Sequence, residues 1–174
     1  MLFENPSIPI TSLPDLSEHS LESLSPAYLK VSQISTILFF SILIAILSGI
    51  YYFAEFSIPY LVQWAVPAAW LFLFLFSLWH TWRNFKVQGF LVREHDLTYR
   101  TGVFFRKTIV IPYNRVQHCE VRQGPIERQF NLRRLEVFTA GGESSDLSIP
   151  GLGGERAEQL KTFVIEKTGQ HENN

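Results

Sequence analysis

Two long apolar runs dominate the first half of the chain. Residues 31–54 and 56–79 contain no Asp, Glu, Lys or Arg, and only Glu55 separates them. An α-helix rises 1.5 Å per residue, so about 20 apolar residues cross a hydrocarbon core of about 30 Å. Each run is long enough to do so. The pattern therefore predicts a membrane α-helical hairpin of two spanning helices over residues 26–84.

The ends of the two runs fit this hairpin. Ser25 and Pro26 are residue types favoured at the N-cap and the first position of a helix. Aromatic residues flank the runs, as expected where helices pass from hydrocarbon to headgroups: Tyr51, Tyr52, Tyr60 and Trp64 at one end, and Trp79 and Trp82 at the other. A cleavable signal peptide and a buried hairpin of a soluble protein are the alternatives. The polar stretch before the first run and the continuous apolar run 70–79 argue against them.

Basic residues predict how the hairpin is oriented. The turn around Glu55 carries no Lys or Arg, whereas basic residues stand at the other ends of both runs. Because Lys and Arg are retained on the cytoplasmic side, we expect a two-pass protein with both termini in the cytoplasm. The expected membrane-surface anchors on the lipid bilayer are Lys30, Arg83, Lys86 and Arg93.

Charge and composition separate the chain into unequal parts. Of the 15 Lys and Arg residues, 14 lie at or after Arg83, together with 11 acidic residues. This mild basic surplus suits an anionic membrane surface, and we expect no nucleic-acid binding. The single cysteine, Cys119, excludes an internal disulfide and fits a reducing compartment. Residues 1–25 have too little apolar periodicity to form a core, and we expect a disordered tail there and at 169–174.

Residues 87–168 show the alternation of a small, mainly β domain. We expect strands at 90–93, 97–100, 103–111, 116–122 and 132–139, with a last strand ending at Pro150. Turns are expected at Thr101–Gly102 and Gly141–Gly142, and one helical turn over 125–130. From Gly154 onward, apolar residues recur at helical spacing. Short antiparallel strands followed by one amphipathic helix predict a split barrel capped by a C-terminal α-helix.

Five segments of this domain resemble successive signatures of the YdbS-like bacterial membrane proteins with a pleckstrin-homology-type domain. They are residues 102–106, 111–117, 124–130, 137–142 and 149–152. The resemblance covers residues 25–167, hairpin included. It implies a pleckstrin-homology-like split barrel on the cytoplasmic face of the inner membrane, and little about biochemical activity. It also implies a membrane protein partner, for which a longer relative with several copies of the same domain is the candidate.

The candidate contact residues lie at irregular points between the expected strands. Pro112 breaks a strand ladder, so we expect a bend there whose side chains project at a corner. A second irregular point follows Gly124. Arg115 and Arg128 could line a groove that binds a partner's carboxylate or a lipid phosphate, because Arg makes two parallel hydrogen bonds to either group. The candidates for partner or lipid contact are Tyr113, Asn114, Arg115 and Arg128.

A structural role for the same region stays open. In that interpretation Arg115, Gln117, Arg128 and Thr139 hydrogen-bond the irregular segments to one another. The expected first hairpin loop of the domain, residues 93–96, has one base against two acids. That balance argues against a phosphoinositide site.

The sequence shows no catalytic, cofactor-binding or metal-binding set. Its five histidines are scattered, and only His118 with Glu120 would share a strand face. A hydrolase or metal site needs a nucleophile with its base, or three to four convergent ligands. The glycine-rich segment 151–154 lacks the Lys and Ser or Thr of a phosphate-binding loop. We therefore expect a protein that is not an enzyme and uses no cofactor.

These observations lead to one functional expectation with two alternatives. We expect a non-enzymatic membrane protein whose cytoplasmic domain mediates protein–protein assembly at the membrane. The domain could instead bind anionic lipid headgroups directly. The protein could also belong to the defence of the envelope against stress or a membrane-active toxin.

Overall fold

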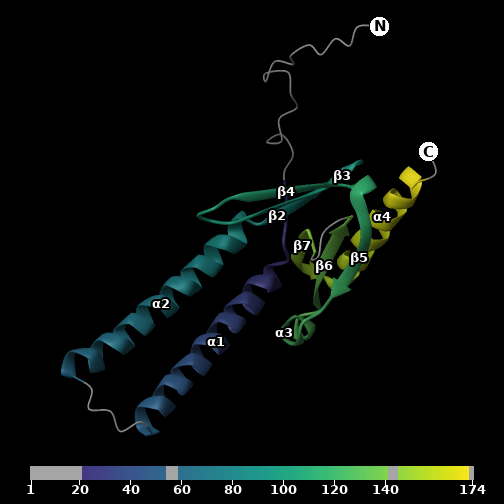
Figure 1. Cartoon of the computed structure of the whole chain (residues 1–174). Coiled ribbons are helices and arrows are strands. Elements are labelled where there is room, and N and C mark those ends of the chain that lie inside the picture. The colour runs from purple at the N-terminus through teal and green to yellow at the C-terminus, as the bar shows by residue number, and fades with distance from the viewer. Residues whose placement is uncertain (1–20, 54–58, 141–144, 173–174) are drawn as a thin grey trace, which may run out of the picture.

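The computed structural model describes residues 21–53, 59–140 and 145–172, and Figure 1 shows two long helices extending from a β domain. Helices α1 (Pro26–Phe53) and α2 (Tyr60–Val87) have 28 residues each. Their most apolar 18-residue windows have mean hydropathies of 2.3 and 1.9, yet only 6% and 0% of those residues are buried within the protein. Long apolar helices that turn their side chains outward are suited to lipid. The predicted hairpin is confirmed, with α2 continuing to Val87.

Aromatic side chains hold the two helices together near their middle. The ring of Phe40 lies 6.0 Å from that of Trp70 and 5.4 Å from that of Phe74, measured between centroids. Phe40 is only 8% exposed, although most large apolar side chains of the two helices face outward. Pro67 lies inside α2, where a neighbouring helix can compensate for the lost backbone hydrogen bond.

The domain consists of two antiparallel sheets and a closing helix. The first sheet has the order β1-β2-β3-β4 and the second β5-β6-β7. The first contains β1 (Glu22–Ser23), β2 (Gly89–Val92), β3 (Asp96–Thr101) and β4 (Lys107–Pro112). The 3-10 turn η3 (Tyr113–Arg115) leads into the second, which contains β5 (Val116–Arg122), β6 (Leu132–Thr139) and β7 (Leu147–Gly153). Short α3 (Pro125–Gln129) follows β5, and α4 (Gly154–Glu172) closes the domain. The predicted split barrel is confirmed.

The first strand comes from the segment that the sequence predicts to be a disordered tail. Glu22 and Ser23 pair with Phe90 and Gly89 of β2, and the adjoining Leu24 is only 2% exposed. The hairpin is thus inserted between β1 and β2, and residues on both sides of it complete the domain. A two-residue strand has no detectable period, which is why alternation did not reveal it. The remaining predicted tail, residues 1–20, lies outside the described residues, as do the turn around Glu55 and Gly141–Gly142.

The core of the domain lies between the two sheets and α4. Its apolar side chains come from β2 to β7, η3 and α4, together with Leu24: Leu24, Phe90, Leu97, Tyr99, Ile111, Tyr113, Val116, Cys119, Leu135, Val137, Leu147, Ile149, Leu152, Ala157, Leu160 and Val164. On α4 the buried side chains of Ala157, Leu160 and Val164 recur at helical spacing while Glu155 and Glu158 are exposed. The amphipathic helix is therefore confirmed, and it continues to Glu172, past the expected end at 168.

Candidate functional site at the base of the helix hairpin

The sequence predicts that the Tyr113 side chain projects at a corner. In the structure it is completely buried instead. Its hydroxyl donates a hydrogen bond to the carbonyl of Arg93 at 2.9 Å, and its backbone N–H donates to the carbonyl of His95 at 3.0 Å. Burial raises the pKa of Tyr113 to about 12, and the nearby Asp96 adds to this effect. The bend after Pro112 is real, but it turns the ring inward. Tyr113 therefore fastens the β2–β3 turn to the beginning of the second sheet.

Arg115 and Arg128 lie at opposite ends of β5. Arg115 ends η3 immediately before the strand, and Arg128 lies in α3 beyond it. The seven residues of β5 extend roughly 20 Å at about 3.3 Å each, and Figure 1 shows that α3 is at the end nearer to α1. Both arginines are exposed, as is Asn114. Arg115 and Arg128 therefore do not line a common groove.

The sequence leaves open a structural, hydrogen-bonding role for Arg115, Gln117, Arg128 and Thr139. Among these four side chains, that of Thr139 has this role. Its N–H and its hydroxyl donate to Asp146 at 2.9 and 2.6 Å, and these bonds hold the pKa of the Asp146 carboxyl below its usual range. Within the described part of the chain, the side chains of Arg115, Gln117 and Arg128 make no hydrogen bond or ion pair. The two arginines are thus exposed cations available to a partner.

Glu127 fixes α3 to the rest of the domain. Its carboxylate accepts a hydrogen bond from the Gly124 N–H at 2.7 Å and lies 3.4 Å from the Arg134 guanidinium. Glu127 is only 8% exposed. A Glu at the third helical position that reaches back to the N-cap backbone is a capping contact. The spacing of Gly124 and Glu127 in the sequence indicates this capping contact. The prediction of one helical turn over 125–130 did not include it.

A polar groove opens where α3 approaches the hairpin. We call it the junction groove; its volume is about 440 Å³. Most of its polar side chains lie at the domain-proximal ends of the two long helices: Ser32, Ser35 and Thr36 of α1, His80, Thr81 and Asn84 of α2, and Gln88 directly after α2. Glu127 and Arg134 line its other side. A second hollow of about 700 Å³ shares Ser35, Thr36, His80 and Thr81 and continues between the helices toward Phe40 and Phe76.

The sequence contained a signal for this groove. The polar residues of each helix recur three and four positions apart, which places them on one helix face. A pattern within one helix does not show which other element of the protein that face contacts. The structure brings the polar faces of α1 and α2 together with α3.

Three of the four expected anchors lie at the domain end of the hairpin. Lys30, Arg83 and Lys86 are exposed there, with the Lys86 ammonium 3.9 Å from the centre of the Trp82 ring. Arg93 is different, because β2 leads away from the end of α2 before reaching it. It lies in the β2–β3 turn, half-buried, with a guanidinium nitrogen 3.9 Å from Asp96. The structure therefore separates Arg93 from the other three.

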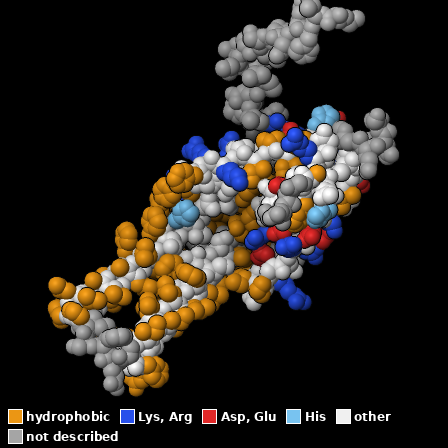
Figure 2. Space-filling model, in the orientation of Figure 1, with side chains coloured by type: hydrophobic (Ala, Val, Ile, Leu, Met, Phe, Trp, Pro, Cys, Tyr) orange, Lys and Arg blue, Asp and Glu red, His pale blue; other side chains and the backbone are white. Residues whose placement is uncertain are grey.

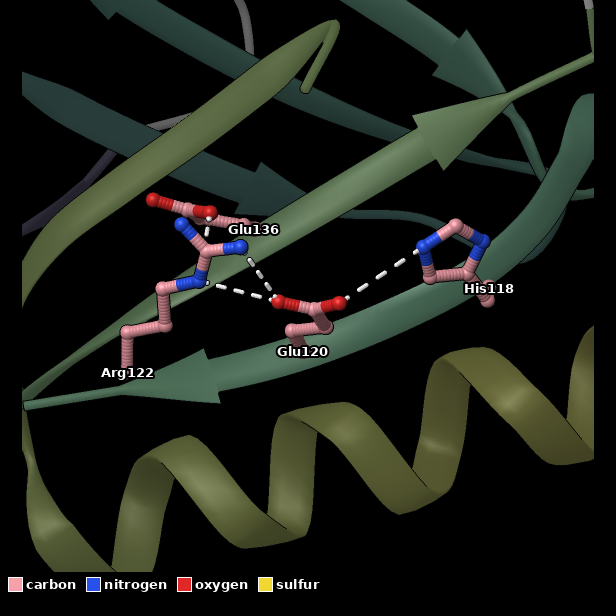
Figure 3. Close-up of polar contacts among 4 residues, drawn as sticks. All are labelled: His118, Glu120, Arg122 and Glu136. Carbon is pink, nitrogen blue, oxygen red and sulfur yellow. Dashed lines mark hydrogen bonds and ion pairs between the residues drawn. The ribbon is translucent and has the colours of Figure 1, made fainter. Parts of the chain in front are cut away.

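A ladder of charged residues covers the outer face of β5 and β6 (Figure 3). Arg122 contacts Glu120 at 2.7 Å and Glu136 at 3.2 Å, and His118 lies 3.8 Å from Glu120. The hydrogen bond to Glu120 raises the pKa of Arg122. The His118 ring stacks on Phe138, with centroids 4.3 Å apart. This is a surface ion-pair network, and isolated pairs of this kind contribute little stability.

The described residues offer no metal centre. No group of three or more His, Cys, Asp or Glu side chains comes together among them in a way that could hold an ion. The buried thiol of Cys119 lies in the core, where burial raises its pKa to about 11. A thiol held in its protonated form is a poor nucleophile.

Comparison with known proteins agrees with the architecture. A family described as Bacterial PH domain matches residues 28–168. The chain is 28% identical over 154 residues to UPF0699 transmembrane protein YdbS of Bacillus subtilis (strain 168), covering 86% of this chain and 93% of that protein. It is 27% identical over 94 residues to UPF0699 transmembrane protein YdbT of the same organism, covering 53% of this chain and 18% of that protein. No solved structure matches it. The chain is therefore a membrane protein of the bacterial PH domain family, similar to YdbS over most of its length.

Proposed function

We propose that this protein is a non-enzymatic assembly module of the bacterial inner membrane. In this proposal the hairpin anchors the PH domain at the cytoplasmic surface, and the junction groove binds part of another membrane protein. The observation that carries the proposal is the groove itself, in which polar faces of both long helices meet α3.

The position of the groove favours a partner that is itself in the membrane. Ser35 is the tenth residue of α1, so it lies about 14 Å along the axis from the start of the helix at 1.5 Å per residue. His80 is seven residues before the end of α2, about 10 Å along that helix. Hydroxyl and imidazole side chains at such positions are among the groups through which membrane helices hydrogen-bond to one another. A helix of a partner protein could satisfy them.

The charge of the groove favours protein over an anionic headgroup. Glu127 and Arg134 are its charged lining residues, and they form an ion pair with each other. This leaves the lining without a surplus cation to attract a phosphate. Its remaining polar groups offer hydrogen-bond donors and acceptors, as a protein contact requires.

The distribution of bases supports the cytoplasmic side for the domain. Lys30, Arg83 and Lys86 stand at the domain end of the hairpin, whereas the loop at the other end contains no Lys or Arg in its sequence. Retention of positive charge in the cytoplasm would orient the protein in this way. Both termini would then be cytoplasmic.

We propose that the partner is a longer relative of the kind represented by YdbT. The similar stretch occupies only 18% of YdbT, so most of that protein lies outside it. A partner with a related helix hairpin would carry helices of the same type, able to place a similar polar face against the junction groove.

Site-specific photocrosslinking in the native membrane tests this proposal. A photoreactive residue at position 35 or 81 of the full-length chain should crosslink to a discrete membrane protein, identified by mass spectrometry. The same residue at Ser41, a serine of α1 that does not line the groove, is the matched control and should crosslink mainly to lipid. Crosslinks to lipid alone at all three positions would overturn the proposal and favour headgroup binding.

Two arginine substitutions sharpen the same experiment. Arg128→Ala changes α3 beside the groove, and Arg115→Ala changes an equally exposed base at the far end of β5. We expect the crosslink from position 35 to fall several-fold in Arg128→Ala and to persist in Arg115→Ala. An unchanged yield in both variants would exclude Arg128 from the contact, and loss only in Arg115→Ala would contradict the groove as the binding site.

A further inference from the structure

The loop between β3 and β4 turns back along α2 and exposes two phenylalanines. Phe104 is 61% exposed and Phe105 is 92% exposed. Gly102 makes the turn possible with a φ of +99°, and a Cβ there would lie 1.9 Å from the carbonyl oxygen of Phe105. The Gly102 N–H donates to the side-chain oxygen of Asn84 in α2 at 3.2 Å. The loop is thus fixed against the helix.

Phe104 reaches part of α2 that belongs to the membrane span. Its ring is stacked on that of His80, with centroids 5.7 Å apart and an angle of 7° between the planes. It also lies 6.4 Å from the rings of Phe76 and Trp79. The loop therefore runs back alongside α2, from the C-terminal end of the helix toward the hydrocarbon.

The depth of this contact follows from the helix rise. Counting about 20 residues of 1.5 Å from Tyr60, which begins α2, reaches Trp79, the expected edge of a hydrocarbon core of about 30 Å. The first exposed base beyond it is Arg83, seven residues or about 10 Å along the helix from Phe76. Phe104 contacts α2 from Phe76 to His80, around the expected edge at Trp79, where aromatic rings are favoured at the boundary of headgroups and acyl chains.

Exposed bases accompany the two phenylalanines. Arg106 and Lys107 follow them directly, and Arg100 of β3 lies opposite Thr108 in the strand pairing. Across the residues that the structure describes, none of these three bases has an ion-pair partner. Figure 2 shows blue basic side chains beside the hydrophobic surface at the domain end of α2. Such bases attract the anionic surface of a membrane.

We propose that residues 102–106 form a membrane-inserted wedge. Phe104 and Phe105 enter the bilayer at the boundary of headgroups and acyl chains, and Arg106 with Lys107 binds lipid phosphates. The insertion holds the first sheet against the membrane at a point separate from the ends of the two helices. The residues proposed to contact lipid, Phe104 to Lys107, do not line the junction groove, although Phe104 stacks on His80, which does.

Spin-label accessibility in the full-length protein tests the insertion. In a Cys119→Ser background, a label at Phe105→Cys is measured in nanodiscs that contain phosphatidylglycerol. A label at Asn114→Cys, exposed at the distal bend, is the matched control. We expect the ratio of oxygen to nickel-chelate accessibility to be several-fold higher at 105 than at 114, because oxygen concentrates in lipid and the chelate in water. Equal ratios, or a label at 105 shielded from both reagents by protein, would overturn the proposal.

The contribution of the bases is tested with the same label at position 105. Arg106→Gln with Lys107→Gln should lower the accessibility ratio in phosphatidylglycerol nanodiscs to the value of the parent in phosphatidylcholine nanodiscs. Arg122→Gln, which removes an ion-paired base from the other sheet, is the control and should leave the ratio unchanged. A ratio insensitive to both the lipid and the double substitution would refute phosphate binding.

Discussion

The two sheets of the barrel use arginine in opposite ways. On the outer face of the second sheet, Arg122 contacts Glu120 and Glu136. In the first sheet, Arg100 of β3 is exposed and makes no ion pair within the described chain. Paired bases need no external ligand, whereas exposed bases next to the hairpin are available to lipid phosphates. The neighbours of an arginine, not its residue type, separate a structural role from a binding role.

The two sheets also differ in how they are joined to the membrane anchor. The first is covalently continuous with both helices, since β1 precedes α1 and β2 follows α2. The second reaches the hairpin through contacts between side chains and backbone. The Ser25 N–H donates to the Gly151 carbonyl at 3.1 Å, and the Tyr28 ring covers Gly151. The comparison therefore predicts that single substitutions can weaken the second sheet while the first remains anchored.

Cys119 provides a readout for the second sheet. It lies in β5, is 8% exposed, and burial raises the pKa of its thiol to about 11. Alkylation at neutral pH should therefore report opening of this sheet. Because the folded thiol loses its proton less readily than the unfolded one, its contribution to stability is complete below about pH 9 and is lost as pH rises toward 11.

The largest effect should follow from breaking the link between the two sheets. Tyr113→Ala removes a fully buried ring and should lower the free energy of unfolding by roughly 3–5 kcal/mol. Tyr113→Phe keeps the ring and loses the hydrogen bond to Arg93, which should cost about 1 kcal/mol. Cys119 alkylation across a denaturant series measures both. Equal, small losses in the two variants would mean that Tyr113 does not join the sheets.

A smaller effect should follow from disturbing the contact of the second sheet with α1. In Gly151→Ala the new Cβ would lie 2.5 Å from the Tyr28 ring at a φ of +66°, so we expect a loss of roughly 1–3 kcal/mol. Gly153→Ala is the matched control, because a Cβ there meets nothing within 4 Å. Cys119 should be alkylated faster in Gly151→Ala alone. Similar rates in the two variants would contradict the importance of this joint.

The smallest effect should separate paired from unpaired bases. Arg122→Gln leaves the nearly buried Glu136 without its cation, and we expect a modest rise in Cys119 alkylation. Arg100→Gln should leave the alkylation rate unchanged, since Arg100 has no ion-pair partner within the described residues. Faster alkylation of Cys119 in Arg100→Gln than in Arg122→Gln would contradict the distinction between paired bases in the second sheet and unpaired bases in the first.

Much of the fold was predictable because its signals are local. The two charge-free runs predicted α1 and α2, alternation predicted β5 and β6, and the spacing of Ala157, Leu160 and Val164 predicted α4. Strand β4 begins later than expected, at Lys107, because Gly102 turns residues 102–106 into a loop. Turn geometry there outweighed the apolar character of the phenylalanines.

The sites were less predictable because they depend on which elements meet. Tyr113 was expected at the surface, but the fold places it under the β2–β3 turn. Arg115 and Arg128 were expected in one groove, but β5 lies between them. The polar positions of α1 and α2 were visible in the sequence, yet only their approach to α3 makes a groove. Each outcome is set by contacts between segments distant along the chain.

The sequence by itself determined that this protein has a helix hairpin suited to a membrane and a small β domain, because apolar length and periodicity act within a single segment. Only the tertiary structure decided that Glu22 and Ser23 complete the barrel, that Phe104 lies on α2, and that the junction groove exists. These features arise from packing between segments separated by up to about 130 residues, as in the contact of Glu22 with Arg156. A periodic pattern within one segment does not indicate which distant segments come into contact.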